Sequence, residues 1–183
     1  MVNSFLTKSG DNALIRYPTL KDIKLATEYI NKISQEDTYI TFSGEQLTEE
    51  EERKYIIESL TKIDAGDMVK LYCFVGNNLV AEGSVERDLR DRKRGLHRAM
   101  LGITVKKEYR EQGIGKSLIK TLIAESKKKI PGIRIVILTV FGSNTKAINL
   151  YRSLGFVEYG RLPEGLMYKE KYEDYVDMYM ILK

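Results

Sequence analysis

The sequence predicts a single mixed α/β domain, in which strands and helices alternate along the chain. Two observations support this class. The length of 183 residues, with 43% hydrophobic and 31% charged residues, fits one globular domain with one substantial core. Apolar residues recur with helical spacing in some segments and with strand patterning in others, and no linker, repeat or low-complexity segment interrupts them. We therefore expect one domain over residues 1–183.

The predicted elements are six or seven strands and about four helices. In chain order they are a strand at 13–17, helices at 20–35 and 48–63, strands at 69–75, 79–88 and 97–105, a helix at 113–128, a strand at 133–140, a helix at 144–154, and strands at 156–162 and 172–182.

Local signals place the elements of the first half. The first helix follows Pro18 and Thr19 and carries apolar residues at helical spacing, namely Ile23, Ala26, Ile30 and Ile33. Thr48 with Glu51 three residues later forms a capping box at the start of the second helix. The turn Gly76-Asn77-Asn78 joins two apolar runs and predicts a hairpin.

Glycine and proline delimit the second half. Gly113 begins a helix that ends before Pro131 and Gly132. The run at 133–140 is almost continuously apolar, which is typical of a central strand buried on both faces. Gly155 is placed as the left-handed residue that ends the helix at 144–154.

The composition excludes several classes of protein. The net charge of +4 is mild and is spread over 30 basic and 26 acidic residues, whereas proteins that bind nucleic acid gather their basic residues on one face. The lone Cys73 lies in an apolar run and is interpreted as a core residue in a reducing compartment. No run approaches the ~20 apolar residues that span a bilayer, and no signal peptide or metal-binding pattern occurs. We expect a cytoplasmic protein without metal, membrane or nucleic-acid partners.

One glycine-containing loop carries the chemistry. Arg110-Glu111-Gln112-Gly113-Ile114-Gly115-Lys116-Ser117 lies between an apolar strand and an amphipathic helix. A helix start exposes unpaired N–H groups at the positive end of the helix dipole, and glycine lets a phosphate approach the backbone. A triphosphate-binding Walker loop would need glycine at Arg110, and a dinucleotide fingerprint would need glycine at Leu118. The remaining pattern is Arg/Gln-x-x-Gly-x-Gly.

With this loop the sequence resembles the GNAT superfamily of N-acetyltransferases. The similarity runs over residues 103–118, resumes at Asn144-Thr145-Lys146-Ala147-Ile148-Asn149-Leu150-Tyr151, and ends at 154–156. The resemblance implies a mostly antiparallel sheet whose two central strands are splayed around the cofactor. It also implies acceptor-side helices at about 19–63 and an acetyl-CoA-binding core at about 97–157.

The resemblance also implies a set of site residues. Backbone groups of the strand at 97–105 would pair with the pantetheine arm of acetyl-CoA, and the amides of residues 111–116 would hold the pyrophosphate. The implied cofactor-binding residues are Ile103, Thr104, Val105, Arg110, Glu111, Gln112, Gly113, Ile114, Gly115, Lys116, Asn144 and Tyr151.

Asn144 and Tyr151 lie two helical turns apart, on one face of the same helix. A plain N-cap explains Asn144 as well as a cofactor contact does, and core packing is the alternative for Tyr151. In the family, the tyrosine at this place lies near the sulfur of CoA and can protonate the departing thiolate. A phenol of pKa ~10 facing a thiolate of pKa ~8.5 favours hydrogen-bond stabilisation as its larger role.

The catalytic base is the least determined residue. The acceptor ammonium must lose a proton before it attacks, and the strand at 97–105 carries no carboxylate. Glu82 is the candidate, with Glu86 near it, although an outward-facing charge or a water chain to solvent would explain the pattern as well.

These observations predict an acyl-CoA-dependent N-acetyltransferase. Acetyl-CoA would donate its acetyl group to a primary amine of a small molecule or a peptide N-terminus, by direct attack in a ternary complex. Residues 36–52 hold seven acids and no base, which favours a cationic amine, yet a helix dipole accounts for Glu49–Glu52 and leaves only Glu36, Asp37 and Glu45. The alternatives are a catalytically silent acyl-CoA-binding module and a nucleic-acid binder using the basic cluster at 87–98. A homodimer is left open.

Overall fold

The computed structural model describes residues 2–36, 38–40 and 42–182. The chain forms two compact units. The first runs to Glu86 and resumes over Gly102–Pro131, and the second comprises Arg87–Leu101 and the chain from Gly132 onward. In the described part of the chain, eight strands hydrogen-bond in the order β1-β2-β3-β4-β5-β6-β8-β7. Strand β5 (Arg98–Val105) begins in the second unit and ends in the first.

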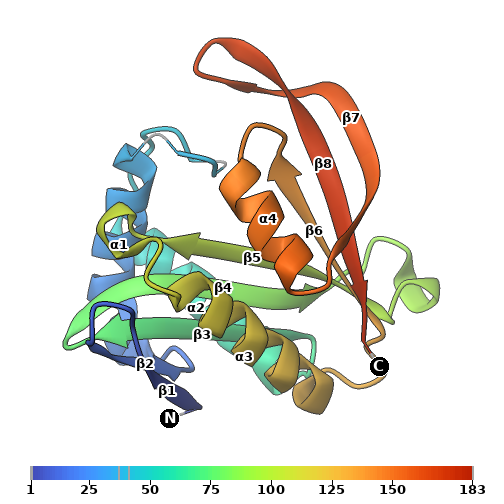
Figure 1. Ribbon diagram of the computed structural model, residues 1–183. Helices are drawn as coiled ribbons and strands as arrows, with labels where there is room; N and C mark the ends of the chain where they lie inside the picture. Colours follow the sequence, from blue (N-terminus) through green and yellow to red (C-terminus); the bar gives the residue numbers. More distant parts are fainter. Residues whose placement is uncertain (1, 37, 41, 183) are drawn as a thin grey trace. The chain divides into compact units, whose positions relative to one another are not determined.

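The first unit is an antiparallel sheet with helices on both faces (Figure 1). In chain order it contains β1 (Asn3–Leu6), β2 (Asn12–Arg16), α1 (Ile23–Gln35), α2 (Glu49–Asp64), β3 (Met68–Val75), β4 (Asn78–Arg87), the end of β5, and α3 (Ile114–Lys129). Short 3-10 turns occur at Leu20–Asp22 and Lys107–Tyr109.

Side chains alternate between the two faces of this sheet. Tyr72 and Phe74 of β3 belong to the core that α1 and α2 close with Ile33 and Ile56. On the other face, a β-carbon at Gly83 would lie 2.8 Å from a methyl group of Leu122 in α3. Glycine at that position therefore lets α3 pack directly on the strands.

The second unit is built on the start of β5, followed by β6 (Ile135–Phe141), α4 (Thr145–Ser153), β7 (Val157–Tyr168) and β8 (Lys171–Ile181). Strands β5 and β6 are parallel, from Arg98 opposite Ile135 to Met100 opposite Ile137. Strand β8 pairs antiparallel with both β6 and β7. The long β7–β8 hairpin is red in Figure 1.

The structure confirms the fold class and the order of the four α-helices. Two features differ from the prediction. Strand β1 was not expected, because Asn3–Leu6 is short and three of its four residues are exposed. Strand β7 is longer than the predicted 156–162: Pro163 and Gly165 resemble a turn, but the ladder absorbs them through a register shift between Leu162 and Leu166. Within the described residues, no helix is long and apolar enough to cross a bilayer.

Candidate functional site

The loop between β5 and α3 has the backbone that an anion site needs. Gly113 is the N-cap residue of α3, with φ of +87°, and provides no side-chain cap to the helix. The space where its β-carbon would stand is open, with nothing within 4 Å. The first turn carries no acid, and Lys116 is exposed on it. Amides at the start of α3 are therefore available to an external acceptor such as a phosphate.

The turn between β1 and β2 supports this loop from one side. The amide of Lys8 donates to the carbonyl of Gln112 at 3.1 Å. Ser9 Oγ donates to the side-chain oxygen of Gln112 at 2.8 Å, and Gln112 Nε2 donates to the carbonyl of Glu108 at 3.2 Å. The side chain of Gln112 thus holds the loop in place. No local sequence pattern indicates this contact, because it depends on the unexpected strand β1.

Arg110 and Thr104, both predicted to bind the cofactor, contact the region of α1. Arg110 Nε donates to the carbonyl of Val105 at 2.9 Å, and its guanidinium forms an ion pair with Glu36. The hydroxyl of Thr104 shares a 2.8 Å hydrogen bond with that of Tyr29. Both side chains therefore already have partners within the protein.

Asn144 and Tyr151 lie on α4, in the second unit. The side-chain oxygen of Asn144 accepts a hydrogen bond of 3.2 Å from the amide of Ala147, so Asn144 is the N-cap of α4. Tyr151 is 9% exposed and packs its ring edge-on against Phe156, with the centroids 5.8 Å apart. Burial raises the pKa of Tyr151 to about 12, so the residue is a neutral phenol at physiological pH.

Glu82, the candidate base, is half of a buried ion pair in β4. Its carboxylate lies 3.0 Å from Lys70 Nζ, and Lys70 is 2% exposed. Burial is the largest single effect and lowers the pKa of Lys70, but the charge and hydrogen bonds of Glu82 and Tyr55 together outweigh it and raise that pKa. Glu86, the neighbouring carboxylate, lies 2.8 Å from Lys62 Nζ. Each candidate carboxylate therefore has a lysine partner that competes with an incoming ammonium.

Glu52 is a titratable residue that sequence reasoning missed. It is 3% exposed, on the buried face of α2. Burial raises its pKa to about 7, with a further contribution from the charge of Glu82 and an opposing one from Lys70. The signal was available in the sequence, because Glu52 shares helical spacing with the buried Ile56 and Ser59.

The acidic segment at 36–52 is largely engaged in local contacts. Glu36 binds Arg110, and Glu45 accepts a hydrogen bond from the amide of Ser43. Glu51 closes the capping box with Thr48. Asp37 lies outside the described residues. These contacts weaken the expectation that the segment attracts a cationic acceptor.

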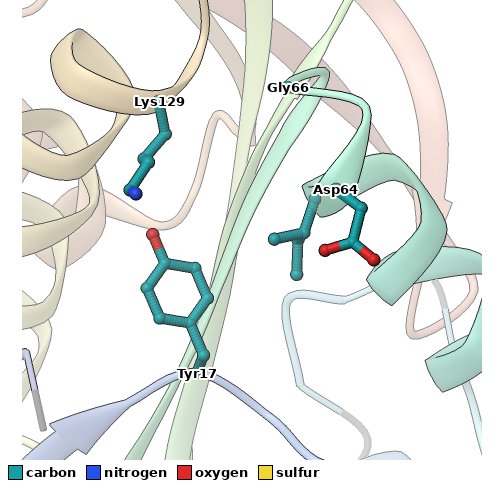
Figure 2. Close-up of a pocket in the computed structure, with 5 residues that line it drawn as sticks. Tyr17, Asp64, Gly66 and Lys129 are labelled. Carbon is teal, nitrogen blue, oxygen red and sulfur yellow. The ribbon is translucent and has the colours of Figure 1, made fainter.

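Two other features lie outside the loop. Cys73 is fully buried, and burial raises the pKa of its thiol to about 12, as suits a core residue. A hollow of about 410 Å³ is lined by Tyr17, Ile63, Asp64, Gly66 and Lys129. Figure 2 shows the hydroxyl of Tyr17 pointing toward the amine of Lys129. Lys129 ends α3, about 24 Å from the loop at the other end of the helix, so this hollow is separate from that loop.

Comparisons with known proteins identify a family and a shared fold. The model of the acetyltransferase (GNAT) family matches residues 28–156. The [ribosomal protein bS18]-alanine N-acetyltransferase of Escherichia coli (strain K12) is 42% identical over 59 residues, which cover 32% of this chain and 38% of that protein. The matched stretch is thus well under half of that relative.

Two solved structures share the fold. A GNAT-family acetyltransferase from Streptococcus pneumoniae superimposes with a TM-score of 0.83 at 27% identity, over 93% of this chain and 99% of that one. A phosphinothricin acetyltransferase from Sinorhizobium meliloti, solved with acetyl-CoA, has a TM-score of 0.78 at 20% identity, over 93% of this chain and 88% of that one. At the level of the family, the match confirms the predictions of an acyl-CoA-dependent acetyltransferase and of acetyl-CoA as its co-substrate.

Proposed function

Because the chain belongs to the acetyltransferase (GNAT) family, we propose that it transfers an acetyl group from acetyl-CoA to a primary amine by direct attack in a ternary complex. The observation that carries this proposal is the open start of α3 at Gly113, which has no side-chain cap and no acid in its first turn. The amides of residues 111–116 bind the pyrophosphate there. Backbone groups of residues 103–105 bind the pantetheine arm.

Tyr151 stabilises the departing thiolate mainly by hydrogen bonding. With a pKa of about 12, the phenol would transfer its proton to a thiolate of pKa ~8.5 at a cost of roughly 5 kcal/mol. A hydrogen bond to the developing negative charge avoids that cost. Tyr151→Phe should therefore lower kcat about tenfold to a hundredfold and leave the KM for acetyl-CoA nearly unchanged.

The acceptor that we propose first is a peptide N-terminus, and a small-molecule amine is second. The curated relative acts on the alanine N-terminus of a ribosomal protein, which supports a peptide acceptor for this chain.

Glu82 remains the predicted base. Once its ion pair with Lys70 opens, Glu82 takes a proton from the acceptor ammonium, and the neutral amine then attacks the thioester. Glu52, whose pKa of about 7 is better matched to proton exchange, is the second candidate.

A catalytically silent acyl-CoA-binding module is the alternative function. The lysine partners of Glu82 and Glu86 favour it, because a base held in an ion pair exchanges protons poorly. The acceptor-side helices at about 19–63, a homodimer and a cytoplasmic location remain predictions.

An acetylation screen separates these functions. Purified protein would be incubated with acetyl-CoA and peptides of varied N-terminal residue, polyamines, aminoglycosides and free amino acids, with release of free CoA as the readout. We expect transfer to at least one peptide. Binding of acetyl-CoA without transfer to any amine would establish the silent module. Absence of binding below about millimolar, a free energy of roughly −4 kcal/mol, would refute both functions.

A further inference from the structure

Arg110, the first residue of the cofactor loop, directs its positive charge at other groups of the protein. Arg110 Nε donates to the carbonyl of Val105 at 2.9 Å, and another nitrogen of the guanidinium forms an ion pair with Glu36. The second oxygen of Glu36 accepts a 3.0 Å hydrogen bond from the amide of Lys107. The Glu36 side chain is 6% exposed and that of Arg110 37%, so the contact is shielded mainly on the Glu36 side.

The position of Glu36 explains why it needs such a partner. Glu36 is the C-cap of α1, where the helix dipole presents its negative end. A carboxylate at that end is disfavoured unless a cation or N–H groups compensate it. Arg110 and the amide of Lys107 supply both kinds of compensation from the turn between β5 and α3. The presence of a glutamate at position 36 is therefore explained by its contacts with the loop, because the end of α1 itself disfavours a carboxylate there.

We propose that Glu36 and Arg110 form a clamp that fixes the cofactor loop to the C-terminal end of α1, so that Arg110 is a positioning residue and makes no contact with the pyrophosphate. The loop is then held on two sides, by the clamp and by the contacts of Lys8 and Ser9 with Gln112. The clamp also ties the loop to the segment that leads from α1 into α2. This inference rests on the proposed function, because it assigns a role within the same site.

The fork shape of the guanidinium is required for the clamp. One nitrogen is directed at a carbonyl and another at a carboxylate, in a fixed plane. A lysine keeps the charge but presents a single ammonium, so it cannot hold both acceptors in that geometry. A residue that only attracts phosphate would tolerate lysine, because the ammonium is an effective phosphate ligand. Arg110→Lys therefore distinguishes the two roles.

The test is a double-mutant cycle on acetyl-CoA binding by the full chain. Glu36→Gln, Arg110→Met and the double variant would be measured by calorimetry at several salt concentrations, with thermal unfolding as a check on folding. We expect each single variant to weaken binding about tenfold, and the double variant to be no weaker than the worse single one. The dependence of Kd on salt should stay as in the unmodified protein, since no phosphate contact is lost.

Controls sharpen the cycle. Lys54→Met removes one side of the exposed Glu50–Lys54 pair, 2.9 Å apart, and should leave the Kd unchanged. Lys116→Met removes an exposed cation from the first turn of α3 and should reduce the salt dependence. Arg110→Lys should weaken binding as much as Arg110→Met does. It is the milder change, and it replaces Arg110→Met in the cycle if that variant unfolds.

The clamp is overturned if Glu36→Gln binds acetyl-CoA normally while Arg110→Met loses affinity and salt dependence, or if Arg110→Lys retains full affinity. Those results would assign Arg110 to the phosphate. They leave the proposed function intact, whereas failure of the unmodified protein to bind acetyl-CoA would refute the proposed function itself.

Discussion

Two helix starts in the first unit present the same kind of unpaired backbone amide, but their side chains treat it in opposite ways. At the start of α2, Thr48 Oγ1 accepts from the amide of Glu51 at 3.2 Å, and the carboxylate of Glu51 accepts from the amide of Thr48 at 2.8 Å. Its first turn consists of four acids. At the start of α3, Gly113 has no side chain to offer, and no acid follows it. One helix start is satisfied by its own residues, and the other is left open.

The difference shows how a sequence selects one helix start as a binding site. Both starts carry the same partial positive charge from the peptide dipoles. Side chains decide whether internal acceptors or a ligand neutralise it. The start of α4 belongs with α2 in this respect, because Asn144 caps it. A phosphate-binding helix is therefore recognised by what its first turn lacks as much as by its glycines.

The largest effect should come from giving α3 the acid that it lacks. Gly113→Asp places a negative charge at the proposed pyrophosphate site and strains a backbone with φ of +87°. We expect acetyl-CoA affinity, measured by calorimetry, to fall about a hundredfold, or ~3 kcal/mol. Gly132→Asp is the matched control, with φ of +72° and open space around its β-carbon position. It should cost comparable stability and leave the affinity unchanged; an equal loss in both variants would contradict the site.

This contrast also marks what the sequence could and could not predict. The open start of α3 and the capping box of α2 depend on neighbours within five residues, and both were predicted correctly. The ion pairs Lys70–Glu82 and Arg110–Glu36 join residues 12 and 74 positions apart. The local sequence around one residue of such a pair does not predict which residue is its partner. Glu52 lies between these cases, because helical spacing places it on the buried face but does not identify Glu82 and Lys70 as its neighbours.

A smaller effect is expected from Glu52, the buried one of the four acids at the start of α2, on how stability depends on pH. Glu52 has a folded-state pKa of about 7, above the ~4.3 of an unfolded glutamate, so the folded state binds its proton more tightly. The Glu52 side chain should therefore leave the free energy of unfolding unchanged at low pH and lower it increasingly as the pH rises toward 7. Glu52→Gln removes that penalty. Urea unfolding should show it gaining about 2.5 kcal/mol relative to the unmodified protein between pH 5 and pH 8.

Glu50→Gln is the control for this pH dependence, because the side chain of Glu50 is 76% exposed and should show no such trend. A Glu52→Gln variant whose relative stability does not change with pH would mean that Glu52 is ionised in the folded protein at neutral pH. It would then be ruled out as a base that exchanges protons near pH 7.

The smallest effect should come from opening the start of α2. Thr48→Ala removes the side-chain acceptor of the capping box and should lower the free energy of unfolding by about 1 kcal/mol, while acetyl-CoA affinity stays unchanged. Thr48→Ser, which keeps the acceptor, is its control.

Asn144→Ala sharpens the comparison, because Asn144 is both the cap of α4 and a predicted cofactor contact. A loss of stability alone would assign Asn144 to the helix, whereas an added loss of affinity would show that a capped helix start can also serve the cofactor.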